Sequence, residues 1–172
     1  EVWKRDPGAM LVLLRKLFSF GRIPEMYRVR DWILAAMKER RDLPEEERNN
    51  ILGEVELNMS FLAFNDISAM SAYHRRACAL MTRPVMGMRG GNWTFGAPSV
   101  LMTYHRTAGG LDRENEEMRE CMPYFYQVTD GHGNGAEHVM RGETELLRGN
   151  WEDAELCWKL AVRAARRKGQ YS

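Results

Sequence analysis

Cysteine, long apolar runs and an excess of either charge are what the sequence lacks, and each absence excludes a class of protein. Its 172 residues contain three cysteines without close spacing, which argues against a disulfide framework and indicates a reducing compartment. The 25 Lys and Arg residues nearly balance the 24 Asp and Glu residues, so the charge points neither to a nucleic-acid surface nor to a membrane surface. The longest apolar stretch, residues 9–14, is far shorter than the roughly 18 residues of a membrane span.

A signal peptide and a strand pattern are missing as well. The apolar residues 10–14 follow a stretch with charges of both signs and lead directly into amphipathic sequence. We therefore expect a cytoplasmic protein. The chain begins with Glu1 rather than Met, from which we expect a fragment or a processed product. Composition alone does not indicate a function.

Four short turn sequences recur along the chain. Gly21, Asn65, Gly109 and Gly149 stand 44, 44 and 40 residues apart. Gly and Asn adopt the left-handed conformation that ends a helix. A large apolar residue follows each of them by two positions and opens a helical pattern. These four apolar residues are Ile23, Ile67, Leu111 and Trp151.

The positions 3, 7, 10 and 14 residues after each of these apolar residues also correspond. They are Met26, Arg30, Ile33, Met37, Met70, His74, Ala77, Met81, Glu114, Met118, Cys121, Phe125, Ala154, Trp158, Ala161 and Ala165. This spacing is one stripe of an α-helix, interrupted by Arg30, His74 and Glu114. A fixed period near 40 built from helix pairs predicts an all-α fold, a right-handed α-solenoid of about four tetratricopeptide-like helical hairpins.

We expect residues 1–172 to form one helical-repeat domain. Its predicted hairpins cover residues 7–41, 44–81, 98–129 and 135–168. Prolines and acidic residues stand near several predicted helix starts, where they are favoured. Pro123 should kink or end its helix, because it lacks a backbone N–H. Trp151 and Trp158 lie on the repeat stripe and are predicted core residues.

Two irregular segments interrupt the repeats. Residues 83–97 contain four glycines and no helical period, and residues 130–135 alternate glycine with polar residues. Loops this long tend to be functional or disordered, and the aromatic side chains of Trp93 and Phe95 favour order. Both segments join one hairpin to the next, so they should emerge at the same edge of the array. We predict that they pack together and form the principal pocket.

Aromatic side chains gather around these segments. Tyr and Trp suit sugar or aromatic ligands, because they offer a flat apolar face and a polar tip. Glu137 and Arg141 are four residues apart, so they can pair with each other or present polar groups to a ligand. Alternatively they form a solvated salt bridge, and Trp93 fills the repeat core. The candidate ligand-binding residues are Trp93, Phe95, Tyr104, Tyr124, Tyr126, His132, Glu137 and Arg141.

Patterns typical of catalysis or metal binding are weak. The glycines of residues 131–135 precede a helix, but a strand before them and a Gly-Lys-Ser/Thr ending are both missing, so a nucleotide site is not indicated. Instead they form a flexible turn or, with His132, recognise a small anionic or polar ligand at the helix start. His74 and Cys78 have a metal spacing without further local ligands. We expect the basic run 163–168 to be a solvated helix end, with nucleic-acid contact as the weaker alternative. We expect no enzyme activity, no metal and no cofactor.

Several segments resemble a known family. Residues 142–161 match the second half of a tetratricopeptide-type repeat. The runs WTFGAPSVL from Trp93, ECMPY from Glu120 and GHGNGAEH from Gly131, with FLAFNDI from Phe61 and HRRA from His74, resemble the helical-repeat region of the large LuxR-type ATP-dependent transcriptional regulators, the group that includes the maltose-regulon activator. The resemblance covers about three-quarters of the chain.

The resemblance implies a place in a longer bacterial protein. Such regulators carry an N-terminal ATPase, a helical-repeat sensor region and a C-terminal helix-turn-helix that binds DNA. This chain has neither a Walker motif nor a recognisable DNA-reading helix pair, so it would be the sensor region alone, without direct DNA contact. Its expected partners are a small-molecule effector, the other domains of the regulator and, in an oligomer, further copies of the chain. The alternative is a protein–protein interaction scaffold, which needs an open groove or an exposed apolar patch rather than an aromatic-lined cavity around Trp93.

Overall fold

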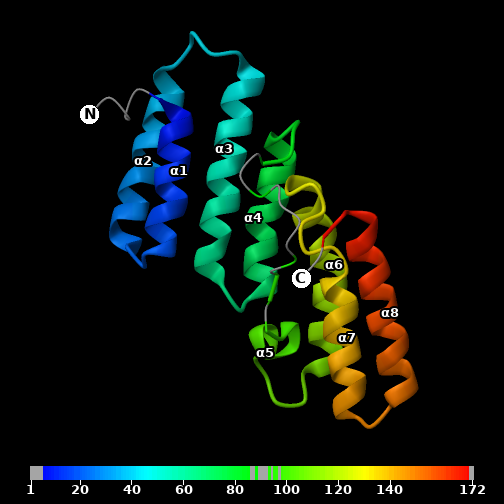
Figure 1. The fold of residues 1–172 in the computed structure, drawn as a ribbon. Coiled ribbons are helices and arrows are strands. Elements are labelled where there is room, and N and C mark those ends of the chain that lie inside the picture. Colours follow the sequence, from blue (N-terminus) through cyan, green and yellow to red (C-terminus); the bar gives the residue numbers. More distant parts are fainter. Residues whose placement is uncertain (1–5, 86–87, 89–92, 94, 97, 171–172) are drawn as a thin grey trace. The chain divides into compact units, whose positions relative to one another are not determined.

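The structure is a computed structural model that describes residues 6–85, 88, 93, 95–96 and 98–170. Within this part of the chain the regular elements are all helical, with eight α-helices and no strand (Figure 1). The predicted all-α fold is therefore confirmed. No described helix is both long enough and apolar enough to cross a membrane.

Contacts divide the chain into two compact units. The first unit comprises Glu1–Leu62 and Ala72–Arg83, and the second comprises Ala63–Ser71 and Pro84–Ser172. The helices of the first half of the chain are α1 (Pro7–Ser19), α2 (Ile23–Glu39), α3 (Glu45–Ser60) and α4 (Ile67–Leu80). Those of the second half are α5 (Val100–Tyr104), α6 (Leu111–Val128), α7 (Ala136–Leu147) and α8 (Trp151–Arg167).

In the first unit α1, α2 and α3 lie beside one another (Figure 1). Their apolar side chains form a buried core. The carboxylate of Asp6 begins α1 by accepting the amide of Gly8 at 2.9 Å, which satisfies a donor that a helix start leaves free. Three glutamates occupy the first turn of α3, where the helix dipole favours negative charge. The fully buried side chains of this core include Met10, Leu14, Met26 and Ile33.

The four predicted turns are confirmed. Gly21, Asn65, Gly109 and Gly149 all have left-handed backbone, with φ of 66°, 66°, 76° and 83°. Two residues after each of them a helix begins, namely α2, α4, α6 and α8. The local sequence thus sets the start of the second helix at all four turns. It also ends the preceding helix directly at Gly21 and Gly149, whereas α5 ends at Tyr104, before the turn at Gly109.

The predicted stripe is largely buried, and two of its three polar interruptions are buried with hydrogen-bond partners. The Nε2 atom of His74 lies 3.1 Å from the Ser60 hydroxyl within the first unit. In the second unit, the Glu114 carboxylate accepts the amides of Arg106 and Thr107, both at 3.0 Å. Buried polar groups of this kind are tolerated because their hydrogen bonds are made within the protein. The third interruption, Arg30, is partly exposed.

In the second unit, α7 packs against α5, α6 and α8, and it runs antiparallel beside α8 (Figure 1). Pro123 was predicted to kink or end its helix; it does not end it, because α6 continues past it to Val128, and the kink stays a prediction. The partner of α6 in the predicted third hairpin is short, since α5 has five residues. The side chain of Ser99 begins α5 by accepting the amide of Met102 at 3.1 Å.

The prediction that Trp151 belongs to the core is also wrong. Its side chain is 70% exposed at the first residue of α8, and the neighbouring Leu147 at the end of α7 is 69% exposed. Both side chains lie at the α7–α8 turn, where no described element covers them. Trp158, two turns further along α8, is partly buried against Gly142 of α7, whose absent Cβ would come within 2.5 Å of the indole nitrogen.

Candidate functional site

The loop between α6 and α7 lies directly against Phe95 and against α8. Gly133 has a left-handed φ of 70°, and a Cβ added there would lie 2.6 Å from the Cβ of Phe95. Gly135 has a φ of 97°, and its Cβ would lie 3.0 Å from the Cα of Ala161. Glycine is therefore needed at both positions, because φ is positive and a side chain would collide with Phe95 or Ala161. We call residues 131–135 the glycine loop.

Gln170, just beyond α8, holds the glycine loop in place through two hydrogen bonds. Its amide nitrogen donates to the carbonyl of Gly131 at 2.6 Å, and its amide oxygen accepts the N–H of Gly133 at 2.9 Å. Gln170 is only 6% exposed, so these bonds face little competition from water. The side chain of Asn134 adds a bond to the carbonyl of Ala164 at 3.3 Å. The glycine loop is thereby tied to the C-terminal end of α8.

Trp93 approaches the glycine loop from the other irregular segment. Its indole N–H donates to the carbonyl of Asn134 at 3.3 Å. The predicted contact between the segment 83–97 and the loop before α7 is therefore present. The further prediction that the whole segment is ordered falls in part on residues 86–87, 89–92, 94 and 97, which lie outside the described residues.

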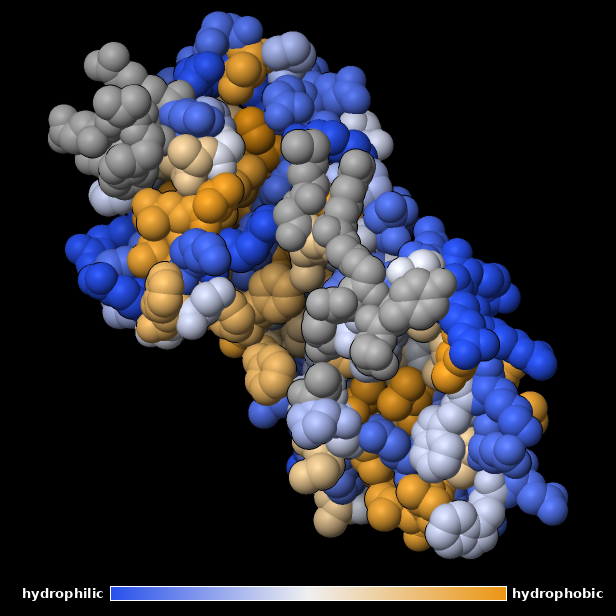
Figure 2. Space-filling view, viewed as in Figure 1, coloured by the Kyte–Doolittle hydropathy of each residue, from blue (hydrophilic) through white to orange (hydrophobic). Residues whose placement is uncertain are grey.

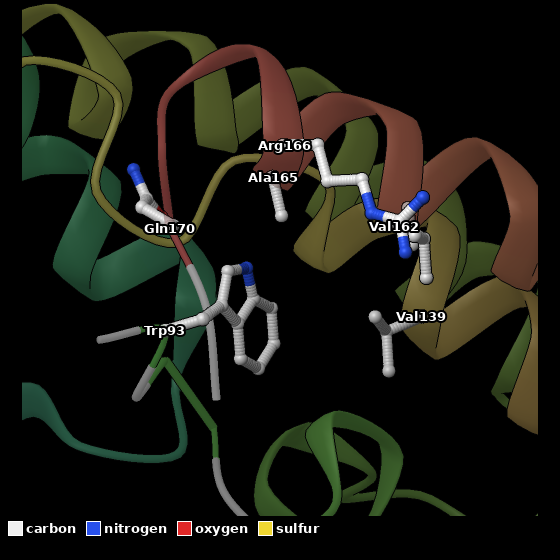
Figure 3. A pocket seen from close by; sticks show the side chains of 7 residues that line it. Trp93, Val139, Val162, Ala165, Arg166 and Gln170 are labelled. Carbon is white, nitrogen blue, oxygen red and sulfur yellow. The ribbon is translucent and has the colours of Figure 1, made fainter. Parts of the chain in front are cut away.

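A cavity of about 410 Å³ opens beside Trp93, within the second unit (Figure 3). Trp93 and Val139 face α8, and Gln170 lies at one side of the indole ring. On the other side the guanidinium of Arg166 extends along α8 toward Val162 (Figure 3). The lining residues are Trp93, Val139, Ala161, Val162, Ala165, Arg166 and Gln170. We call this cavity the Trp93 pocket.

Of the eight candidate binding residues, Trp93 alone lines this pocket. Phe95 and Tyr104 are 7% and 3% exposed and stack on each other with ring centroids 5.6 Å apart. Phe95 also lies 5.2 Å from the ring of Phe125. Because these rings fill the core of the second unit, they are not available to a ligand in the pocket. Burial raises the pKa of the Tyr104 hydroxyl.

Tyr126 and Glu137 form a structural pair at the start of α7. The Tyr126 hydroxyl donates to the Glu137 carboxylate and accepts the amides of Gly135 and Ala136 at 3.1 and 3.2 Å. Burial and then the neighbouring carboxylate raise the pKa of Tyr126. The amides at the first turn of α7 are thus occupied by a tyrosine. Tyr124, two residues earlier, is partly exposed and lines no part of the pocket.

His132 lies in the glycine loop with its ring against Phe125, the centroids 6.2 Å apart. It is partly buried, and this burial lowers the pKa of its imidazole. His132 therefore packs against Phe125 and does not line the Trp93 pocket.

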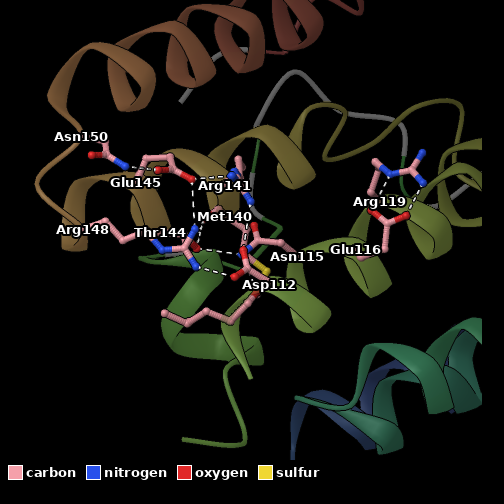
Figure 4. A network of polar contacts seen from close by, with 11 residues as sticks. Asp112, Asn115, Glu116, Arg119, Met140, Arg141, Thr144, Glu145, Arg148 and Asn150 are labelled. Carbon is pink, nitrogen blue, oxygen red and sulfur yellow. Dashed lines mark hydrogen bonds and ion pairs between the residues drawn. The ribbon is translucent and has the colours of Figure 1, made fainter. Parts of the chain in front are cut away.

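Arg141, in the middle of α7, belongs to an ion cluster that extends to the C-terminal end of this helix (Figure 4). It pairs with Glu145 at 2.6 Å and with Asp112 at 3.4 Å, instead of pairing with Glu137 as one expectation had it. Asp112 also binds Arg148 at 2.8 Å. The cluster joins the first turn of α6 to the last turns of α7, and it contributes no side chain to the pocket.

Most of the pocket lining was not among the sequence candidates. Ala161 and Ala165 were assigned to the repeat stripe, and Arg166 to a solvated basic run. The available signal was the pair of small residues four apart on one face of α8, which leaves room for another group. Gln170 carries no local signal, because its role depends on the glycine loop almost 40 residues away.

Among the described residues, no group of three His, Cys, Asp or Glu side chains could hold a metal ion. Comparison with known proteins gave no match to a family model, to a curated protein or to a solved structure.

Proposed function

We propose that this chain is the effector-sensing helical-repeat region of a LuxR-type transcriptional regulator, and that a small molecule binds in its Trp93 pocket. The observation that carries the proposal is the pocket itself. Its volume of about 410 Å³ lies in the range of roughly 300–1,000 Å³ that small-molecule sites occupy. The described residues of its walls are mostly apolar, with one aromatic ring and few polar groups, which is typical of such sites.

The proposal includes a tetratricopeptide-like solenoid of four helix pairs. Four left-handed turns at nearly equal spacing, each followed two residues later by a helix, support this arrangement. In repeat arrays each helical repeat packs mainly on the neighbouring repeats, so a ligand that contacts two repeats changes the packing between them. Such a change would be relayed to ATPase and DNA-binding domains of the same cytoplasmic regulator.

The pocket is suited to sensing because its walls come from three separate segments. Trp93 precedes α5, Val139 lies on α7, and the remaining side chains lie on or just after α8. A ligand that contacts all three favours the conformation in which they lie together. The ligand would thus shift the population toward that conformation, by an amount set by the difference between its affinities for the two conformations.

A thermal-shift screen of sugars, amino acids and aromatic metabolites tests the proposal. A ligand at 100 times its dissociation constant stabilises the fold by about 2.7 kcal/mol, which for a domain of this size raises Tm by roughly 5–10 °C. The Trp93→Ala variant should lose this shift. Trp151→Ala, which removes an exposed indole from the same unit, should keep it. A shift that survives Trp93→Ala would place the ligand elsewhere.

The alternative function, a protein-interaction scaffold, is favoured by one observation. Large apolar side chains are exposed around the α7–α8 turn: Leu147 at the end of α7 (69%), Trp151 at the start of α8 (70%) and Leu156 further along α8 (56%). Figure 2 shows apolar surface near the α7–α8 turn. Exposed apolar surface of this kind is typical of interaction sites. If no small molecule shifts Tm, and a protein partner binds in a manner that Trp151→Ala abolishes, the scaffold is the function.

A further inference from the structure

Arg166 differs from the other arginines of the second unit that face carboxylates. Arg106 pairs with Asp66 and Glu117, and Arg148 pairs with Asp112 and Glu145. By contrast, within the part of the chain that the structure describes, Arg166 forms no ion pair. Its guanidinium is exposed at the side of an apolar pocket, where it can meet a ligand.

Among the described lining residues, the other polar side chains of the pocket already have partners. The indole N–H of Trp93 donates to Asn134, and both ends of the Gln170 amide bind the backbone of the glycine loop. In the described part of the lining, a ligand therefore finds one strong polar group that it can bind without breaking a bond inside the protein. That group is a cation with planar donors, which binds carboxylate, sulfonate or phosphate oxygens in pairs.

The remaining lining is apolar. Trp93 offers an aromatic surface, and Val139, Ala161 and Val162 offer aliphatic side chains. A ligand rich in hydroxyl groups would leave most of those groups without partners against these walls, which costs free energy. A flat or branched hydrocarbon body suits the walls, because it gains from leaving water.

We propose that the ligand of the Trp93 pocket is a small organic anion, with a compact aromatic or branched apolar body against Trp93 and Val139 and its negative group bound to Arg166. This inference rests on the proposed function and specifies the chemical class of the effector. It favours an amphipathic acid over a neutral sugar. Arg166 binds the negative group of the ligand, and the apolar walls select ligands whose body fits between them.

Two fluorescent probes that differ by one charged group test the inference on the full chain. 8-Anilinonaphthalene-1-sulfonate has an apolar body with a sulfonate, and N-phenyl-1-naphthylamine has the same ring system without it. We expect Arg166→Gln to weaken binding of the sulfonate about tenfold, the effect of one lost charge-assisted contact, and to leave the neutral probe unchanged. Arg167→Gln removes the same charge one residue later from a side chain outside the pocket lining, and it should change neither affinity.

The outcomes separate the inference from the proposed function. If Arg166→Gln and Arg167→Gln affect the sulfonate equally, Arg166 is a solvated helix-end cation and the anion inference is overturned, while Trp93-dependent binding of either probe keeps the pocket. If Trp93→Ala, with unchanged helical content by circular dichroism, alters the binding of neither probe, the proposed function fails as well. Trp93→Phe keeps a ring but loses the hydrogen bond to Asn134, so its affinity for both probes should lie between those of wild type and Trp93→Ala.

Discussion

The indole N–H of Trp93 donates to the carbonyl of Asn134 at 3.3 Å, across 41 residues of sequence. The side chain of Asn134 in turn donates to the carbonyl of Ala164 on α8 at 3.3 Å. Asn134 thus joins the segment before α5 to the helix that forms the opposite wall of the pocket. This connection helps to hold the indole ring of Trp93 beside α8.

Gln170→Ala should loosen the glycine loop. The change removes two buried hydrogen bonds, to Gly131 and Gly133, so the free energy of unfolding should fall by about 1–3 kcal/mol. Urea denaturation measures this loss, and hydrogen exchange of the Gly133 amide should accelerate. Gln127→Ala removes an exposed glutamine from α6 and serves as the matched control, with little change expected.

Gly133→Ala should destabilise the second unit more than Gly149→Ala does. Both glycines have left-handed backbone, with φ of 70° and 83°, so each alanine costs about 1–2 kcal/mol of conformational energy. At Gly133 the new methyl also meets Phe95, which adds about 1–3 kcal/mol, whereas nothing lies within 4 Å at Gly149. Equal losses in chemical denaturation would show that Phe95 does not pack on the loop.

The stability of the first unit should fall between pH 6.5 and pH 4 because of His74. Burial lowers the pKa of this imidazole to about 4, while in the unfolded chain it stays near the ordinary value of 6.5. In this pH window the imidazole is protonated in the unfolded state and neutral in the folded state. Acidification therefore favours unfolding, and this group lowers the free energy of unfolding by up to about 3 kcal/mol.

A His74→Gln variant should lose this part of the pH dependence, and His138→Gln, which replaces a partly exposed histidine, should keep it. Urea midpoints recorded at pH 7, 6, 5 and 4 compare the three proteins. Identical pH profiles for wild type and His74→Gln would contradict the assignment.

Trp158 and Trp151 should differ in their effect on stability. Trp158→Ala leaves a gap beside Gly142 and should cost about 2–4 kcal/mol. Trp151→Ala removes a 70% exposed side chain and should stay within about 0.5 kcal/mol of wild type. Thermal unfolding of the two variants measures the difference, and a large loss from Trp151→Ala would mean that another element covers the α7–α8 turn in solution.

The sequence predicts the helical framework well because its determinants are local. A left-handed Gly or Asn followed two residues later by an apolar residue marks each second helix, and Asn65 shows that the turn need not be glycine. Whether a side chain at a helix end is buried depends on which other elements pack there, and the local sequence does not show this. For that reason the prediction of Trp151 as a core residue is wrong.

The pocket could be anticipated only in part. Trp93 stood out because a large aromatic residue in a glycine-rich segment needs a partner. The partners themselves depend on tertiary packing, because Gln170 and Ala165 become pocket residues only when the glycine loop folds against α8. Phe95 and Tyr104 were candidate binding residues but are buried in the core. Sequence alone does not separate the two roles, because aromatic residues are common both in ligand sites and in cores.

The most direct test of the account follows the indole N–H signals of the five tryptophans by NMR while 8-anilinonaphthalene-1-sulfonate is added. The Trp93→Phe spectrum assigns the Trp93 signal, since this variant lacks it. If a small molecule binds where we propose, the Trp93 signal shifts in proportion to occupancy and the Trp151 signal stays in place. A Trp93 signal that remains fixed at saturation, while that of Trp151 moves, would contradict the account.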